Sequence, residues 1–136
     1  MLVEDIMIRS VVTLTAEQPL RDAVDLLRSK HIRQLPVVEG SQLIGIITDR
    51  DVKRALPSIL SGVERADYDR ILDTATVSQF MTREPMTVTP DTGLKAAVTI
   101  FIDRKVGALP VVATGKLVGI ITQIDVLQVL HDMLAD

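Results

Sequence analysis

Cysteine is absent from the 136 residues, so the chain can form neither disulfides nor thiolate metal sites, and it has no cysteine nucleophile. Aromatic residues make up 2% of the sequence, too few for the stacking platform on which proteins bind single-stranded nucleic acid. A basic excess is also missing, because 15 lysines and arginines stand against 18 aspartates and glutamates, for a net charge of -3. The composition therefore argues against a nucleic-acid-binding protein.

Long apolar runs are absent as well. No stretch approaches the roughly 18 residues that span a bilayer, and the first residues are acidic where a secretory signal would be basic. We therefore expect a soluble, cytoplasmic protein. Hydrophobic residues (47%) and charged residues (24%) occur in the proportions of folded globular proteins. The length suits one ordinary domain, or two very small ones that share a core.

The sequence contains an internal repeat. Residues 3–52 align with residues 77–126 without a gap, and 19 of the 50 aligned pairs are identical. Each half is too small to bury an adequate core alone, so we expect the halves to pack about a pseudo-two-fold axis. The expected organisation is repeat 1 at residues 1–56, a linker at residues 57–76 and repeat 2 at residues 77–136.

The linker mixes charges with apolar side chains. Tyr68, Ile71 and Leu72 have helical spacing within residues 64–73, which is typical of a surface helix. Such a helix serves either as a spacer or as a contact for a partner.

Hydrophobic spacing changes in the same order within each repeat. Residues 11–14 favour a short strand, and the apolar positions from Leu20 to Leu27 recur with helical spacing. Two short apolar runs with a turn between them then predict a hairpin, and a last helix begins near Asp49. Repeat 2 has the same order, with its last helix beginning near Gln123. The pattern predicts an α/β fold in which the order β-α-β-β-α occurs twice.

The most specific motif is a turn of the form Gly-x-x-Thr-x-x-Asp between the last strand and the last helix. It places Thr48 before Asp51 in repeat 1 and Thr122 before Asp125 in repeat 2. A helix N-terminus that follows a strand in this way attracts anions through its unpaired N–H groups. The same spacing also fits a capping box, in which the two side chains only terminate the helix. Both interpretations stay open at this point.

These residues resemble those of paired CBS domains, named after cystathionine β-synthase and also called Bateman modules. Members have the β-α-β-β-α order, a strand of the type Leu-Pro-Val-Val, found here at residues 35–38 and 109–112, and the Thr-x-x-Asp turn. The opening residues 1–7, the turn at residues 48–51 and the long acidic linker are most similar to the acetoin-utilisation (AcuB-type) subgroup. The resemblance implies one Bateman module, which we expect to be a stand-alone protein because the chain ends soon after repeat 2.

The resemblance also implies a regulatory module that senses an adenosine-containing molecule in the cleft between the repeats. AMP, ADP or ATP is the first expectation, and S-adenosylmethionine or NAD are further candidates. In the family the aspartate of the turn bonds the ribose hydroxyls and the threonine lies near the ribose-phosphate, while the other repeat surrounds the adenine. The first site would contain Asp51, Thr48, Arg33, Gln34 and Arg50, with Met86, Val106 and Gly107. The second would contain Asp125, Thr122, Val12 and Ile32.

The two predicted sites differ in charge. The first site has cationic residues nearby in the sequence: Arg33, Arg50, Lys53 and Arg54. The corresponding positions around Asp125 are uncharged: Gly107, Ile124, Leu127 and Gln128. We expect a phosphorylated nucleotide at the Asp51 site, because cations pair with phosphates, and an uncharged ligand or none at the Asp125 site. The alternative is that these cations form an ordinary solvated helix face.

Three classes of function remain: a nucleotide-sensing regulator, a structural dimerisation module without nucleotide, and an enzyme. The regulator would act through an unidentified partner protein or through self-association as a homodimer. An enzyme is not expected, because His31 and His131 are far apart and the sequence offers neither a Ser-His-Asp arrangement nor a metal cluster. No cofactor is expected to be obligatory, and whether magnesium accompanies the nucleotide is left open.

Overall fold

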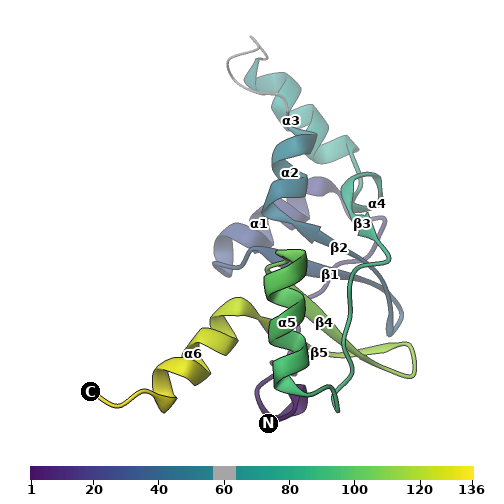
Figure 1. Ribbon diagram of the computed structural model, residues 1–136. Helices are drawn as coiled ribbons and strands as arrows, with labels where there is room; N and C mark the ends of the chain where they lie inside the picture. The colour runs from purple at the N-terminus through teal and green to yellow at the C-terminus, as the bar shows by residue number, and fades with distance from the viewer. Residues whose placement is uncertain (57–63) are drawn as a thin grey trace. The chain divides into compact units, whose positions relative to one another are not determined.

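The computed structural model describes residues 1–56 and 64–136 (Figure 1). Its contacts divide the chain into two compact units, which are described separately. Unit 1 consists of Met1–Val11, Ser41–Leu43 and Pro85–Asp136. Unit 2 consists of Val12–Gly40 and Ile44–Glu84.

In its described residues, unit 2 combines a small sheet with four helices. Its elements are α1 (Leu20–Ser29), β1 (Gln34–Glu39), the larger part of β2 (Gln42–Thr48), α2 (Asp49–Ala55), α3 (Arg65–Thr74), α4 (Val77–Phe80) and the short β3 (Thr82–Arg83). Strand β3 pairs antiparallel with β2, with Ile46 opposite Thr82. The fully buried side chains of its core include Leu14, Leu20, Leu35, Val37, Ile47 and Val77.

Unit 1 is built around a second hairpin. Its elements are the short 3-10 helix η1 (Val3–Asp5), α5 (Leu94–Arg104), β4 (Ala108–Ala113), β5 (Lys116–Thr122) and α6 (Gln123–Met133). Its core includes the buried side chains Val3, Val88, Ala97, Leu109, Val111 and Ile121. In the described part of the chain, no helix is both long and apolar enough to cross a membrane.

The helices begin where the spacing predicts them. α1 starts at Leu20, with Pro19 as its extended N-cap residue, and α2 and α6 start at Asp49 and Gln123. Helix α2 is the shorter of the equivalent pair, because Leu56 is already extended, as expected for a residue that precedes a proline in the sequence. A helix, α3, also lies where the charged linker predicts one.

The first predicted strand of each repeat is shorter than expected. Residues 11–14 form only an isolated parallel bridge between Leu14 and Val37, and residues 87–89 form one between Val88 and Val111. The chain turns immediately after each bridge, where the Thr15 amide donates to the Gln18 side chain at 2.7 Å. Each segment therefore contributes a buried residue to its core without extending the ladder.

Two short segments are exchanged between the sequence repeats. Residues 1–11 precede repeat 1, yet they belong to unit 1, where the Val3 amide donates to the Thr92 carbonyl at 2.8 Å. Residues 77–84 begin repeat 2, yet they belong to unit 2, where the Val77 amide donates to the Gln18 carbonyl at 2.9 Å. The compact units are therefore not two consecutive blocks of sequence.

The exchanged segments explain the glycine in each Gly-Ile-Ile-Thr strand. A Cβ added at Gly45 would lie 2.8 Å from the Met81 sulfur and 2.9 Å from the Thr82 carbonyl oxygen. At Gly119 it would lie 2.7 Å from the Met7 sulfur and 3.0 Å from the Ile8 carbonyl oxygen. These glycines are required by the close approach of an exchanged segment, which supplies a packing reason for the motif.

Candidate functional site

The Asp51 turn joins β2 to α2 in unit 2. Thr48 is the extended N-cap residue, and its amide donates to Asp51 Oδ2 at 2.9 Å. In return the Asp51 amide donates to Thr48 Oγ1 at 3.1 Å, which completes a capping box. The Asp49 amide donates to the Arg33 carbonyl at 3.0 Å, so the start of β1 is tied to the same turn. The capping interpretation is therefore correct for the local backbone.

The cap uses only part of the Asp51 carboxylate. The side chain is 7% exposed, and Oδ2 also lies 3.5 Å from the Thr82 hydroxyl on β3. Among the described residues, every hydrogen bond of this carboxylate goes to Oδ2. Oδ1 keeps its capacity to accept hydrogen bonds, as a pair of sugar hydroxyls would require.

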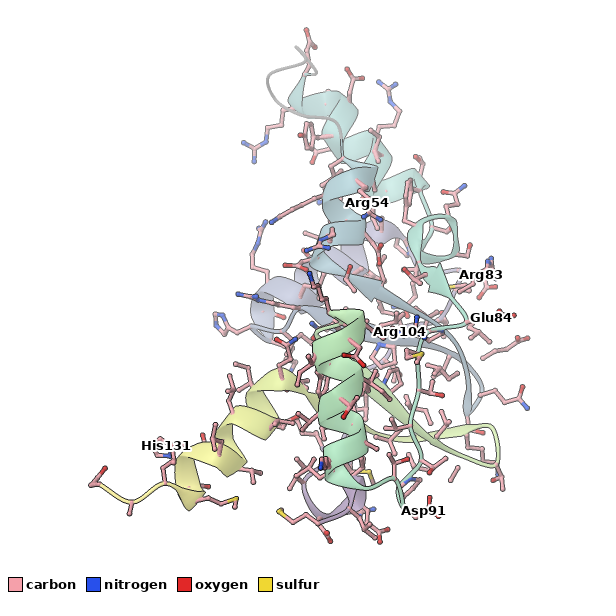
Figure 2. The ribbon with its side chains drawn as sticks, in the orientation of Figure 1. Arg54, Arg83, Glu84, Asp91, Arg104 and His131 are labelled. Atoms are coloured by element: carbon pink, nitrogen blue, oxygen red, sulfur yellow. The ribbon has the colours of Figure 1, made fainter. Side chains whose placement is uncertain are left out.

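Four cationic residues lie at the Asp51 turn and along α2 in unit 2: Arg33 is tied to the turn through its carbonyl, Arg50 is the second residue of α2, and Lys53 and Arg54 are in the last turn of that helix. Arg33, Arg50, Lys53 and Arg54 are all exposed, and Figure 2 labels Arg54 on α2. Within residues 1–56 and 64–136, no carboxylate lies within 4.0 Å of their charged nitrogens. Unpaired guanidinium and ammonium groups of this kind can bind phosphate oxygens.

The Asp125 turn of unit 1 has the same cap with different surroundings. Asp125 Oδ2 accepts the Thr122 amide at 2.8 Å and the Thr122 hydroxyl at 2.9 Å, and the aspartate is half-buried. The Gln123 amide donates to the Gly107 carbonyl at 3.2 Å. Ile124 and Leu127 are exposed where unit 2 has Arg50 and Lys53. The first turns of its helix therefore carry no lysine or arginine.

The structure distributes the predicted site residues over both units. Unit 2 contains the polar residues predicted for the first site: Thr48, Asp51, Arg33, Gln34 and Arg50. It also contains Val12 and Ile32, which were predicted for the second site and which pack partly against the core of unit 2. Unit 1 contains Thr122 and Asp125 of the second site, and also Met86, Val106 and Gly107, which were predicted for the first site. The polar groups at each turn are thus found together, while the assignment of adenine contacts to residues of the other unit stays a prediction.

Thr82 is a contact of Asp51 that the sequence analysis missed. The repeat alignment contains a hint of this contact. Thr82, which has a hydroxyl, aligns with Ile8, which has none, so the two turns differ at this position. The residue lies outside the Thr-x-x-Asp motif and approaches Asp51 only because β3 pairs with β2.

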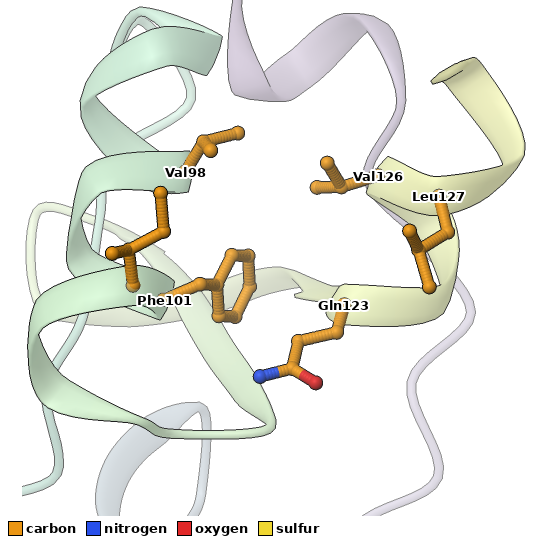
Figure 3. Close-up of a pocket in the computed structure, with 6 residues that line it drawn as sticks. Val98, Phe101, Gln123, Val126 and Leu127 are labelled. Carbon is orange, nitrogen blue, oxygen red and sulfur yellow. The ribbon is translucent and has the colours of Figure 1, made fainter.

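A pocket of about 210 Å³ lies between α5 and α6 of unit 1 (Figure 3). Its lining residues are Val98, Phe101, Ile102, Gln123, Val126 and Leu127. In the close-up, Val98 and Phe101 on α5 lie on the opposite side of the pocket from Val126 and Leu127 on α6. The lining is almost entirely apolar, so the pocket suits an apolar side chain better than a charged ligand.

The protein-family model of the CBS domain matches the sequence twice, at residues 3–58 and at residues 77–132. The chain is 33% identical to the protein MJ1225 of Methanocaldococcus jannaschii over 129 residues, which are 94% of this chain and 42% of that protein. It spans less than half the length of the first curated relatives that it matches. CBS-domain pairs are generally regulatory rather than catalytic.

Two solved structures have the same fold over nearly the whole chain. A putative acetoin utilization protein (AcuB) from Vibrio cholerae is 30% identical, with a TM-score of 0.81 over 98% of this chain and 92% of that one. CBSX2 from Arabidopsis thaliana, solved in complex with AMP, is 25% identical, with a TM-score of 0.80 over 97% of both chains. The predicted α/β fold with two CBS repeats is confirmed, and this chain belongs to the CBS-domain family as a CBS pair.

Proposed function

We propose that the chain is a regulatory module that binds a phosphorylated adenosine nucleotide at the Asp51 turn of unit 2. The observation that carries this proposal is the buried carboxylate of Asp51, whose Oδ1 can accept ribose hydroxyls while the adjoining helix α2 and the start of β1 carry exposed cations. AMP is the first candidate, since the related CBSX2 was solved in complex with AMP. ADP and ATP carry more phosphate charge and suit the same cations.

The Asp125 turn is proposed to bind no nucleotide phosphate. Its helix presents Ile124 and Leu127 in place of Arg50 and Lys53, so a phosphate there would lose water without gaining a charged partner on that helix. An uncharged nucleoside, or no ligand, fits this turn better. Magnesium would matter only at the Asp51 turn, as a companion of ATP.

The test is calorimetric titration of the ligand-free protein with AMP, ADP and ATP, each with and without magnesium. Asp51→Ala should abolish most binding, while Asp125→Ala is the matched control, because it removes the same capping carboxylate from the other unit. Thermal unfolding gives a second measurement, because a ligand present at about a hundred times its dissociation constant stabilises the fold by roughly 2.7 kcal/mol. Equal losses in both variants, or binding unaffected by Asp51→Ala, would overturn the assignment.

Self-association is the proposed route by which binding reaches other molecules, alongside an unidentified partner protein. Exposed apolar side chains cover α6, namely Ile124, Leu127, Leu130 and Met133. Figure 1 shows α6 extending away from the β4–β5 hairpin toward the C-terminus. A second copy is the proposed occupant, since the face offers both protruding side chains and the α5–α6 pocket, as a self-complementary contact needs.

Charge supports the same arrangement. With the two-fold axis perpendicular to α6, the two copies of this helix run antiparallel. The end of one α6, with Asp132, would then approach the start of the other, where Gln123 contacts Val106 and the exposed Arg104 and Lys105 lie nearby in the sequence. Leu127→Glu should convert the dimer to a monomer in sedimentation velocity. Lys53→Glu, at the equivalent position of α2, should leave the dimer intact, and a wild-type monomer at all concentrations would contradict the proposal.

The runner-up is a structural dimerisation module without a bound nucleotide, favoured by the apolar α6 face. It predicts a dimer that no nucleotide stabilises. The same titrations and sedimentation runs decide between the two functions.

A further inference from the structure

Thr82 lies on the short strand that an exchanged segment adds to unit 2. Its partner in the ladder is Ile46, two residues before the helix-capping residue Thr48. This pairing fixes the backbone of Thr82 and brings its hydroxyl 3.5 Å from Asp51 Oδ2. The contact is at the long limit for a hydrogen bond between a hydroxyl and a carboxylate.

The equivalent contact is missing from unit 1. Ile8 occupies the corresponding place, where its amide and carbonyl pair with Ile120 at 2.8 and 2.9 Å, and its side chain has no donor. Asp125 Oδ2 is approached instead by the hydroxyl of its own capping residue, Thr122, at 2.9 Å. In the Asp125 turn, the capping hydroxyl is therefore used within the cap.

The Thr48 hydroxyl is used differently. It accepts the Asp51 amide at 3.1 Å, and none of the described residues accepts its proton. A hydroxyl that already accepts one hydrogen bond still has a proton to donate. Because Thr82 supplies the hydroxyl contact to Asp51 Oδ2, the Thr48 proton can go to an oxygen of the ligand.

We infer that Thr82 is a positioning residue that makes the Asp51 turn the ligand-binding one of the two. Its hydroxyl holds Asp51 Oδ2, which directs Oδ1 to the ribose hydroxyls and leaves the Thr48 proton for the ribose-phosphate. This inference rests on the proposed function. It adds that affinity depends on an exchanged segment outside the Thr-x-x-Asp motif, and that the Ile8 position accounts in part for the weaker second turn.

The first experiment compares the affinity of Thr82→Val, Thr82→Ser and the wild type for AMP. Valine has nearly the shape of threonine without the hydroxyl, and strands accept it readily. Loss of one hydrogen bond to a charged group predicts about a tenfold weaker affinity for Thr82→Val. Thr82→Ser should bind AMP within about twofold of the wild type. Ile8→Val, which trims the equivalent residue of unit 1, is the matched control and should leave the affinity unchanged.

A second titration separates positioning from a merely structural role. 2′,3′-Dideoxy-AMP lacks the hydroxyls that Asp51 is proposed to bind. If Thr82 acts through Asp51, removing these hydroxyls costs less affinity in Thr82→Val than in the wild type, because coupled groups are not additive. If Thr82 only holds the strand, removing the ribose hydroxyls weakens binding by the same factor in Thr82→Val as in the wild type.

The outcomes are distinct. Thr82→Val with wild-type affinity, Thr82→Ser as weak as Thr82→Val, or additive losses with the dideoxy ligand would each overturn the inference and leave the proposed function standing. A wild-type protein that binds no nucleotide would overturn the proposed function, and the role of Thr82 with it.

Discussion

The two turns of the molecule share one backbone design and differ in what surrounds it. Both carry a threonine cap, a returning aspartate and a glycine that admits an exchanged segment. In the described residues, however, all large exposed hydrophobic side chains belong to unit 1, while the cations around a turn belong to unit 2. The capping and glycine positions that shape the turns are therefore the same in both repeats, whereas the neighbouring exposed residues are cationic in unit 2 and apolar in unit 1.

The largest effect that can probe this comparison is a cavity at the equivalent core positions. Ile47 and Ile121 are both fully buried, so Ile47→Ala and Ile121→Ala should each lower the free energy of unfolding by about 2–5 kcal/mol. Since β2 begins in unit 1 and continues in unit 2, we expect a single calorimetric transition in both variants. Two separate transitions would show that the units are stable independently of each other.

A smaller effect is expected at the glycines. Gly45→Ala and Gly119→Ala should each cost about 1–3 kcal/mol, because the new methyl group meets a backbone oxygen as well as a movable methionine. Denaturant titration measures this loss. Gly45→Ala should also weaken AMP binding, since it displaces Thr82, whereas Gly119→Ala should not. Equal AMP affinities in the two variants would remove the distinction between the turns.

The smallest effect concerns an ion pair of unit 2 that has no counterpart among the described residues of unit 1. Arg21 on α1 donates to Asp73 on α3 at 2.5 Å, which lowers the pKa of Asp73 below its ordinary value of 3.8. A lowered pKa in the folded state stabilises the protein above pH 3.8, and this contribution disappears as the pH falls through the lowered pKa. Asp73→Asn should therefore reduce the melting temperature slightly at pH 7, because the pair is exposed.

The pH dependence supplies the control for that variant. The difference between wild type and Asp73→Asn should narrow as the pH falls below 3.8. Lys95→Gln alters the residue of unit 1 equivalent to Arg21 and should show no such dependence. A difference between wild type and Asp73→Asn that stays constant down to pH 2 would contradict the assignment.

Much of the fold followed from spacing along the chain. The stripe from Leu20 to Leu27 and the proline before it located α1, and the repeat alignment transferred the same reasoning to α5. These features depend on neighbouring residues, so a local pattern reports them. The predicted first strands were too long, because their pairing depends on a single contact such as that of Leu14 with Val37.

The exchanged segments could not be predicted from local patterns. The alignment begins at Val3 and Val77, which suggests two consecutive blocks. The Val3 amide, however, donates to the Thr92 carbonyl, and the Val77 amide donates to the Gln18 carbonyl. Long-range pairing of this kind leaves no periodicity. For the same reason the capping pairs Thr48–Asp51 and Thr122–Asp125 were found from spacing, whereas Thr82 was not.

The exchange also bears on how such a chain can be divided. A fragment that ends after repeat 1 would carry residues 1–11 without the partner strand they pair with, and it would lack residues 77–84 that complete its own sheet. Two identical single repeats could satisfy both needs only by trading segments, as in a domain-swapped dimer. With both repeats in one chain the exchange is intramolecular, so it does not depend on protein concentration, whereas separate repeats would exchange segments only when concentrated.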